Sequence, residues 1–215
     1  MKSILVIGMG RFGRHLAEKM QELGNDVMIV DENENIIEDL APTFADSHIG
    51  DCSSENVIRS LGVNNFDICF VMIGSNFQSS LIVTSLLKRN GAKFIVAKAR
   101  HEIQRELLYT IGADEVIYPE RDLSENIAVR YNADNIFDYI QLTDNYAIYE
   151  IPARPEWDGM SISELNVRRK YKVNIIAVKQ DNSLNPAPGP DYRFSKNDHI
   201  VVLGESSDVF RMAAK

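Results

Sequence analysis

Cysteine is scarce in this sequence. Among its 215 residues only Cys52 and Cys69 carry a thiol, they form no C-x-x-C pair, and neither has a histidine at metal-ligand spacing. A disulfide framework and a structural zinc site are therefore disfavoured. So few cysteines fit a reducing, cytosolic compartment.

Long apolar runs are missing as well. No stretch reaches the roughly 20 apolar residues that span a bilayer, and Met1 and Lys2 lead directly into a strand-like run rather than into a signal peptide. The net charge of −8 also argues against nucleic-acid binding. We expect a cytoplasmic protein, so any role at a membrane must come through a partner protein.

Short apolar runs alternate with amphipathic segments over the first 118 residues. The apolar runs are Ile4–Ile7, Val27–Val30, Asp46–Ile49, Ile68–Met72, Phe94–Ala97 and Glu115–Tyr118. The amphipathic segments are 11–23, 34–41, 54–61, 76–90 and 101–111, and Ser75 with Gln78 predicts a capping box at the start of the fourth. This alternation predicts an α/β fold with a Rossmann-like, doubly wound parallel sheet over residues 1–119.

The pattern changes after Pro119. Residues 120–133 predict a helix with Asp122 as its N-cap, and residues 137–142 form a short apolar strip. We interpret 120–142 as a crossover helix and linker. Its apolar residues are expected to be exposed and to pack against another subunit; they include Ile136, Phe137, Tyr139 and Ile140.

Residues 143–215 predict a small α+β unit. We expect strands at Ala147–Ile151, Val173–Val178 and His199–Leu203, and helices around 162–167 and 207–213. The proline-rich stretch 185–190 predicts a loop.

A glycine motif follows the first expected strand. Gly8, Gly10 and Gly13 form G-x-G-x-x-G, which allows a tight turn, close approach of the backbone to a phosphate, and close packing of helix on strand. Asp31 lies at the end of the second expected strand, at the position of a carboxylate that binds ribose hydroxyls and disfavours a 2′-phosphate. The motif indicates an adenine dinucleotide or nucleotide; a turn without a ligand is the alternative.

Arg11 is a cation in the first turn of a helix, where the helix dipole opposes it unless an anion is present. Backbone N–H groups can already bind the pyrophosphate of a dinucleotide. An additional arginine therefore indicates a ligand with a terminal phosphate, such as ADP or ATP. A solvated surface arginine is the alternative interpretation.

Catalytic residue types do not form a recognisable group. The four histidines, His15, His48, His101 and His199, have no obvious acidic partner in the sequence. Tyr192 and Lys196 have the spacing of a dehydrogenase pair but follow a proline-rich loop, where we expect a hairpin rather than a helix. We therefore expect no enzyme activity. An NAD(H)-responsive redox sensor or oxidoreductase on the same fold is the alternative.

These motifs occur in the same order as in a known family. The sequence resembles the RCK (also called KTN) domains that regulate potassium channels and transporters. The resemblance is strongest to the cytosolic regulatory subunits, KtrA/KtrC-like, of bacterial Ktr potassium-uptake systems. It covers nearly the whole chain. The matching stretches are 6–13, 30–33, 50–51, 73–76, 98–100, 111–114, 119–120, 165–168 and 198–204.

The resemblance implies a nucleotide site for ATP or ADP, with NAD(H) as a ligand of some relatives. Its residues are Gly8, Gly10, Arg11, Phe12, Gly13, Asp31, Glu32, Asn33, Asp51, Cys52, Ile73, Gly74, Ser75, Lys98, Ala99, Arg100 and Glu120. Residues 31–33 would hold the ribose, 51–52 would border the adenine, and 73–75 with 98–100 would line the site.

Glu120 would help a divalent cation, Mg or Ca, to sit between phosphates at a dimer interface. From the residues alone, several members of this set have plainer roles. Glu120 suits the start of any helix, Gly74 and Ser75 suit a turn and cap, and Lys98 and Arg100 suit solvated strand ends.

The resemblance also implies a second ligand and an assembly. Cyclic di-AMP would bind the C-terminal lobe, near a basic cluster at 168–172, through Ile162, Arg168, Asn174, Ile175 and Pro188. A solvated basic helix end is the alternative. The subunits would form homodimers and then an octameric ring, which would dock on a membrane potassium-transporter subunit (KtrB/KtrD-like) at the inner face of the membrane.

Overall fold

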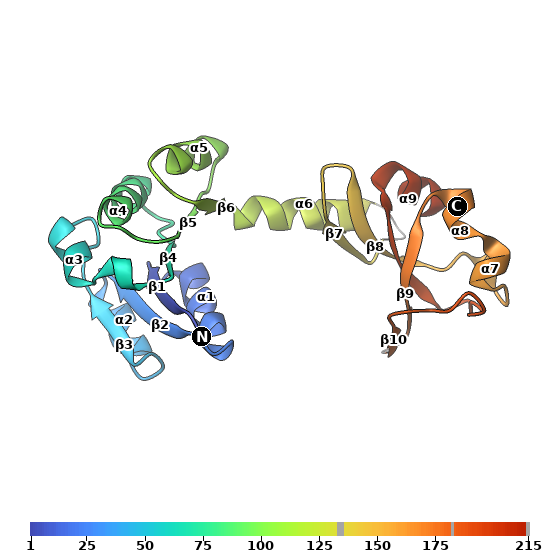
Figure 1. Cartoon of the computed structure of the whole chain (residues 1–215), viewed down its shortest axis with the longest axis horizontal. Coiled ribbons are helices and arrows are strands. Elements are labelled where there is room, and N and C mark those ends of the chain that lie inside the picture. The colour runs from blue at the N-terminus through green and yellow to red at the C-terminus, as the bar shows by residue number, and fades with distance from the viewer. Residues whose placement is uncertain (133–135, 182, 214–215) are drawn as a thin grey trace. The chain divides into compact units, whose positions relative to one another are not determined.

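The computed structural model describes residues 1–132, 136–181 and 183–213. The chain divides into two compact units, one ending at Arg121 and the second beginning at Asp122 (Figure 1). No helix in the described part of the chain is long and apolar enough to cross a membrane.

The first unit is a six-stranded parallel sheet with the order β3-β2-β1-β4-β5-β6. Its strands are β1 (Ser3–Ile7), β2 (Asp26–Asp31), β3 (Asp46–Ile49), β4 (Ile68–Val71), β5 (Ile95–Lys98) and β6 (Glu115–Ile117). Its helices are α1 (Arg11–Glu22), α2 (Glu34–Leu40), α3 (Glu55–Ser60), the 3-10 turn Val63–Asn65, α4 (Phe77–Arg89) and α5 (Glu102–Thr110). This order confirms the predicted doubly wound, Rossmann-like sheet.

Both faces of this sheet are buried, which explains the continuous apolar strands. Along β1, Leu5 and Ile7 pack into the cluster that includes α3, α4 and α5. Ile4 and Val6 point to the opposite cluster, with α1 and α2. The helices therefore lie on both sides of the sheet (Figure 1).

The second unit is a five-stranded antiparallel sheet with the order β10-β9-β11-β8-β7. Its strands are β7 (Asp138–Gln141), β8 (Tyr146–Pro152), β9 (Asn174–Gln180), β10 (Ser183–Asn185) and β11 (His199–Glu205). Its helices are the 3-10 turn Pro155–Trp157, α7 (Ile162–Leu165), α8 (Val167–Tyr171) and α9 (Ser206–Ala213). The core holds Tyr149, Trp157, Ile200, Val202 and Met212. This confirms the small α+β unit.

Two expected helix starts are wrong. The cap of α4 is Asn76, whose side chain accepts a hydrogen bond from Ser79 N–H, so Ser75 forms no capping box. Helix α6 (Pro119–Asn132) begins at Pro119, before Asp122. Proline fits the first helical turn because that turn needs no N–H donor.

The interpretation of 137–142 as part of a linker is also wrong. Residues 138–141 form β7, which pairs with β8 in the second sheet. Ile136 is buried and Tyr139 half-buried on the core side, whereas Phe137 and Ile140 remain exposed. A strand at a sheet edge buries only some of its apolar side chains, so its composition does not distinguish it from a linker. Residues 133–135 lie outside the described residues.

Candidate nucleotide site

The predicted nucleotide residues all follow the carboxyl ends of strands. The glycine turn follows β1, Asp31 ends β2, and Asp51 follows β3. The segments 73–75, 98–100 and 119–120 follow or end β4, β5 and β6. Because the six strands are parallel, these ends lie along one edge of the sheet, which is where open α/β sheets bind ligands. The order of strands reverses between β1 and β4, beside the glycine turn.

The turn requires glycine at positions 8 and 13. Gly8 has φ +97°, and its N–H donates to the Val30 carbonyl oxygen at 2.8 Å. A Cβ on Gly13 would lie 2.0 Å from the Gly8 carbonyl oxygen, so only glycine lets α1 approach β1 this closely. Gly10 is the N-cap of α1 and supplies no side-chain cap. The amides at the start of α1 are thus available to an anion.

Asp31 is joined directly to this turn. Its Oδ2 accepts a hydrogen bond from Met9 N–H at 2.6 Å, and its Oδ1 accepts one from Asn33 N–H at 2.9 Å. Asn33 in turn caps α2, and Glu32 is exposed beside it. A carboxylate has about four acceptor positions, so Asp31 can still accept hydrogen bonds from ribose hydroxyls.

Cys52 lies below this edge as an apolar contact rather than a nucleophile. Its thiol is buried, and burial, with the charges of Asp51 and Asp31 adding to it, raises its pKa to about 12. The thiol therefore stays protonated at neutral pH. Asp51 is exposed, and its Oδ1 accepts a hydrogen bond from Ser53 N–H at 2.8 Å.

Lys98 is the most enclosed cation of the predicted set, with a side chain only 10% exposed. Its Nζ lies 2.6 Å from Glu120 Oε1 and 5.1 Å from the ring centroid of Phe12. The hydrogen bond from Lys98 is the main reason why the pKa of Glu120 lies below its ordinary value. The sequence named these residues separately but did not predict their pairing.

The other predicted residues of segments 73–75 and 98–100 differ in their hydrogen bonds and in their burial. Arg100 Nη1 donates to the Gly74 carbonyl oxygen at 2.9 Å, which ties the loop after β4 to the end of β5. Ile73 is half-buried and Ala99 fully buried, while Ser75 is exposed. Gln104, which the sequence did not single out, accepts a hydrogen bond from Arg100 N–H.

Arg11 is exposed in the first turn of α1. Within the described residues its side chain has no ion pair or hydrogen bond. A free guanidinium next to open helix amides is suited to a phosphate.

Glu120, the predicted metal residue, pairs with Lys98 and belongs to no cluster of three metal-ligating side chains within the described ranges. The described residues contain no group of three histidine, cysteine or acidic side chains that could hold a metal ion. A cation at Glu120 would therefore need oxygen ligands from outside this set, such as phosphates. The metal role of Glu120 stays a prediction.

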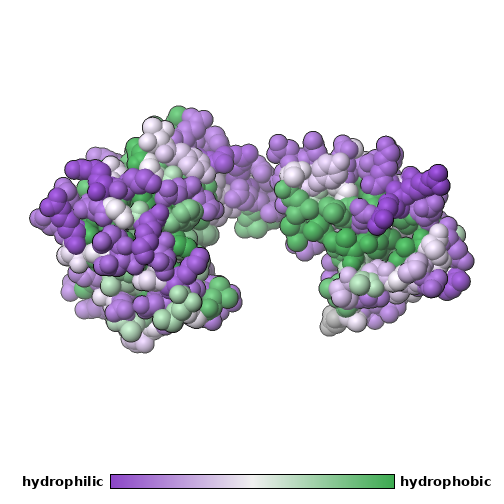
Figure 2. All heavy atoms as spheres, in the orientation of Figure 1, coloured by the Kyte–Doolittle hydropathy of each residue, from purple (hydrophilic) through white to green (hydrophobic). Residues whose placement is uncertain are grey.

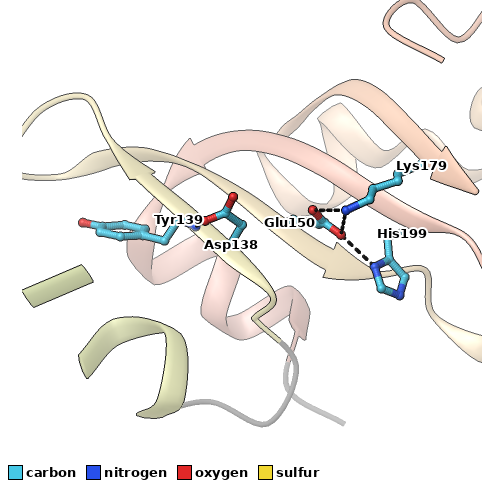
Figure 3. Close-up of polar contacts among 5 residues, drawn as sticks. All are labelled: Asp138, Tyr139, Glu150, Lys179 and His199. Carbon is cyan, nitrogen blue, oxygen red and sulfur yellow. Dashed lines mark hydrogen bonds and ion pairs between the residues drawn. The ribbon is translucent and has the colours of Figure 1, made fainter. Parts of the chain in front are cut away.

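Two of the four histidines, His15 and His199, have acidic partners in the described part of the chain, contrary to the sequence expectation. His199 Nδ1 lies 2.8 Å from Glu150 Oε1, and Lys179 Nζ lies 3.0 Å from the same oxygen (Figure 3). Phe137 stacks on the His199 ring at 4.2 Å between centroids. His15 also lies 3.4 Å from Glu18. Strand pairing brings β8, β9 and β11 together, which explains how residues 49 positions apart meet.

Tyr192 and Lys196, which have the spacing of a dehydrogenase pair, contact different acidic residues. Tyr192 Oη donates to Asp198 Oδ2 at 2.7 Å, and Lys196 Nζ lies 3.7 Å from Asp158. Burial first, and then Asp198, raise the pKa of Tyr192 to about 12. Both residues lie outside the helices, as predicted, and Tyr192 supports the buried Asp198.

In the second unit the structure brings two predicted cyclic di-AMP residues together. Arg168 Nε donates to Asn174 Oδ1 at 2.6 Å. Arg168 belongs to α8, which also carries Arg169 and Lys170 in its last turn. These exposed cations form a local positive patch next to β9.

The apolar residues predicted to contact cyclic di-AMP lie on three segments: Ile162 begins α7, Ile175 lies in β9, and Pro188 lies in the loop after β10. Ile162 and Ile175 are half-buried against the core. Pro188 is half-buried in a loop whose Pro190 carbonyl oxygen accepts a hydrogen bond from Ser163 N–H at 2.9 Å. Figure 2 shows hydrophobic residues gathered on the visible face of this unit, whereas the visible face of the first unit is mostly hydrophilic.

The fold and its glycine turn define a class: two-lobed proteins with a Rossmann-like nucleotide-binding fold and a small α+β C-terminal lobe. Comparison with known families narrows this class. The TrkA-N domain matches residues 4–119, and the TrkA-C domain matches residues 146–215. The chain therefore belongs to the TrkA/RCK family of potassium-transport proteins, as its motifs predicted.

Individual relatives agree. The chain is 36% identical to Ktr system potassium uptake protein A of Bacillus subtilis (strain 168), and 34% identical to protein C of the same strain. Each match extends over 210 residues, 98% of this chain and 95% of the relative.

Solved structures share the fold. The GsuK RCK domain superposes with a TM-score of 0.68 at 20% identity, over 99% of this chain and 47% of that chain. The GsuK channel bound to NAD gives 0.70 at 21% identity, over 96% of this chain and 38% of that chain.

Proposed function

We propose that this chain is a non-catalytic, cytosolic regulatory subunit of a Ktr-type potassium-uptake system, and that ATP and ADP are its ligands in the first unit. The geometry of the glycine turn carries the proposal. Met9 N–H donates a hydrogen bond to Asp31 Oδ2 at 2.6 Å, and the adjacent N-terminus of α1 has no side-chain cap. This arrangement offers hydrogen-bond acceptors to a ribose and donors to phosphates.

Cations along the same edge favour a ligand with a terminal phosphate. Arg11 is exposed at the start of α1. Lys98 is the last residue of β5, and Arg100 lies in the loop that follows. ATP and ADP regulate only to the extent that they bind two conformations differently. Arg11 is the residue that we expect to sense the additional phosphate of ATP.

A binding measurement tests this proposal. Calorimetry with ATP and ADP on the wild type should show binding of both, and Arg11→Ala should reduce the preference for ATP over ADP. An equal loss of affinity for both nucleotides would contradict the role of Arg11. No binding of either nucleotide to the wild type would contradict the proposed function itself.

We also propose an assembly and a membrane partner, on the strength of the Ktr potassium uptake proteins among the relatives. Homodimers would form an octameric ring that docks on a KtrB/KtrD-like subunit, and ATP would favour the active ring. Co-expression with such a subunit and purification from membranes tests the docking, and light scattering of the chain alone tests the ring. A chain that stays monomeric and does not co-purify would refute this part.

Cyclic di-AMP is the proposed ligand of the second unit. The Arg168–Asn174 pair supports it, because a guanidinium held in place by an amide suits a phosphodiester. Arg168→Ala should abolish binding of cyclic di-AMP and leave ATP binding intact. Arg211→Ala, which removes an arginine paired with Asp208 in α9, is the control.

NAD(H) is the alternative ligand of the first unit, because Asp31 suits any adenosine ribose with a free 2′-hydroxyl. Thermal shifts with ATP, ADP, NADH and NADPH separate the two proposals. A response to NADH alone would favour a redox sensor or an oxidoreductase.

A further inference from the structure

Lys98 touches two helices that have different roles in this unit. Its Nζ lies 5.1 Å from the ring centroid of Phe12, in the first turn of α1, where a phosphate would bind. The same atom lies 2.6 Å from Glu120 Oε1, in the first turn of α6. The Lys98 side chain is only 10% exposed. Its ammonium group is therefore largely shielded from water, and its charge must be balanced by an anion next to it, here Glu120.

Ion pairs attach the first turn of α6 both to β5 and to α5. Lys98–Glu120 fastens it to the end of β5, at the edge that carries the glycine turn. Arg121 Nη1, 2.8 Å from Glu102 Oε2, fastens it to α5. The first pair alone shares a residue with the proposed nucleotide site.

We propose that the Lys98–Glu120 ion pair is a latch that a bound phosphate opens: the phosphate on the glycine turn draws the Lys98 ammonium away from Glu120 and frees the first turn of α6. This inference rests on the proposed nucleotide function and assigns its mechanical output. Two anions compete for one enclosed cation, so a ligand with more phosphate charge opens the latch further. ATP therefore acts more strongly than ADP at this point.

Binding measurements in EDTA, where no divalent cation contributes, test the competition. Glu120→Gln removes the competing anion, so ATP should bind about threefold tighter, the range of a partly exposed ion pair. This gain includes simple relief of charge repulsion between Glu120 and the phosphate. The same substitution is therefore repeated in a Lys98→Met background, where the latch predicts that most of the gain disappears.

Hydrogen exchange of the backbone amides of residues 120–125 tests the effect on α6. ATP should speed exchange there in the wild type, and Glu120→Gln should show fast exchange with or without ATP. Lys93→Met is the matched control. It breaks an ion pair with Asp67, 3.1 Å long, at the amino ends of β4 and β5, and should change neither ATP affinity nor exchange in α6.

The outcomes separate the two proposals. A wild type that binds no ATP removes the proposed function and the latch with it. A wild type that binds ATP, together with an equal gain from Glu120→Gln in both backgrounds or unchanged exchange in α6, overturns the latch alone. A smaller gain in the Lys98→Met background and faster exchange on ATP binding support it.

Discussion

The carboxylate of Asp31 holds the backbone of Met9 in the middle of the glycine turn, with 2.6 Å between Oδ2 and the amide nitrogen. The residue that the motif assigns to the ribose thus also fixes the turn where we propose that the phosphates bind. One acid at the end of β2 couples the two halves of the candidate site.

Asp31→Asn tests this double role. An amide group cannot accept hydrogen bonds from both backbone amides and from a ribose as well, so we expect a loss of about 1–2 kcal/mol in the free energy of unfolding. Affinity for ATP should fall roughly tenfold, the loss of a charge-assisted hydrogen bond. Asp26→Asn, at the opposite end of β2, is the control, and calorimetry and urea unfolding are the measurements. Unchanged ATP affinity in Asp31→Asn would contradict the assignment.

Gly13→Ala probes the close approach of α1 to β1. Its Cβ would lie 2.0 Å from a backbone oxygen, so the helix must shift, and we expect destabilisation of about 1–3 kcal/mol. Gly74→Ala is the control, because a Cβ there has nothing within 4 Å and Gly74 is not a helix N-cap, whereas Gly10 caps α1, where alanine is itself unfavourable. Urea unfolding followed by circular dichroism compares the two variants. Equal stability of both would mean that the turn adapts more easily than its geometry indicates.

The second unit should lose stability in acid through Glu150. Burial alone raises the pKa of this carboxyl group, but hydrogen bonds from His199 and Lys179 outweigh burial and leave the pKa below its ordinary value. A lowered folded pKa contributes stability above the unfolded pKa, and this contribution is lost as the pH falls through the folded pKa.

Fluorescence of Trp157, the sole tryptophan and a buried residue of this unit, reports the unfolding. Between about pH 5 and pH 3 the wild type should lose stability more steeply than Glu150→Gln. Parallel pH profiles of the two proteins would show that Glu150 does not contribute to acid stability.

Both cysteines should resist alkylation in the native protein. Burial raises the pKa of Cys52 and of Cys69 to about 12, and the thiolate is the reactive form. With iodoacetamide at pH 8, mass spectrometry should show no adduct on the folded chain and two adducts after unfolding in guanidinium. Rapid modification of Cys52 in the folded chain would show that its surroundings open in solution.

Local patterns were sufficient for much of the first unit. The glycines of residues 8–13, Asp31 and the alternation of apolar runs predict the turn, the acid and the parallel sheet, because each depends on neighbours along the chain. Helix starts were less certain. Ser75 and Asn76 both suit a cap, and only the path of the chain into α4 selects Asn76.

Local sequence patterns did not predict ion pairs or strand pairing between residues that are distant in the sequence. The sequence offered no local reason to join His199 to Glu150, or Lys98 to Glu120, because strands and helix starts distant in sequence bring them together. It also gave no sign that 138–141 joins a sheet, since an edge strand keeps exposed apolar residues much as a linker does.

By itself, the sequence determined the Rossmann-like sheet, its glycine turn, the acid at the end of β2 and the family to which the chain belongs. Tertiary structure alone decided which charges meet and where β7 pairs. The physical reason is range: backbone conformation responds to residues a few positions away, whereas ion pairs and strand pairing depend on distances that only the folded chain sets.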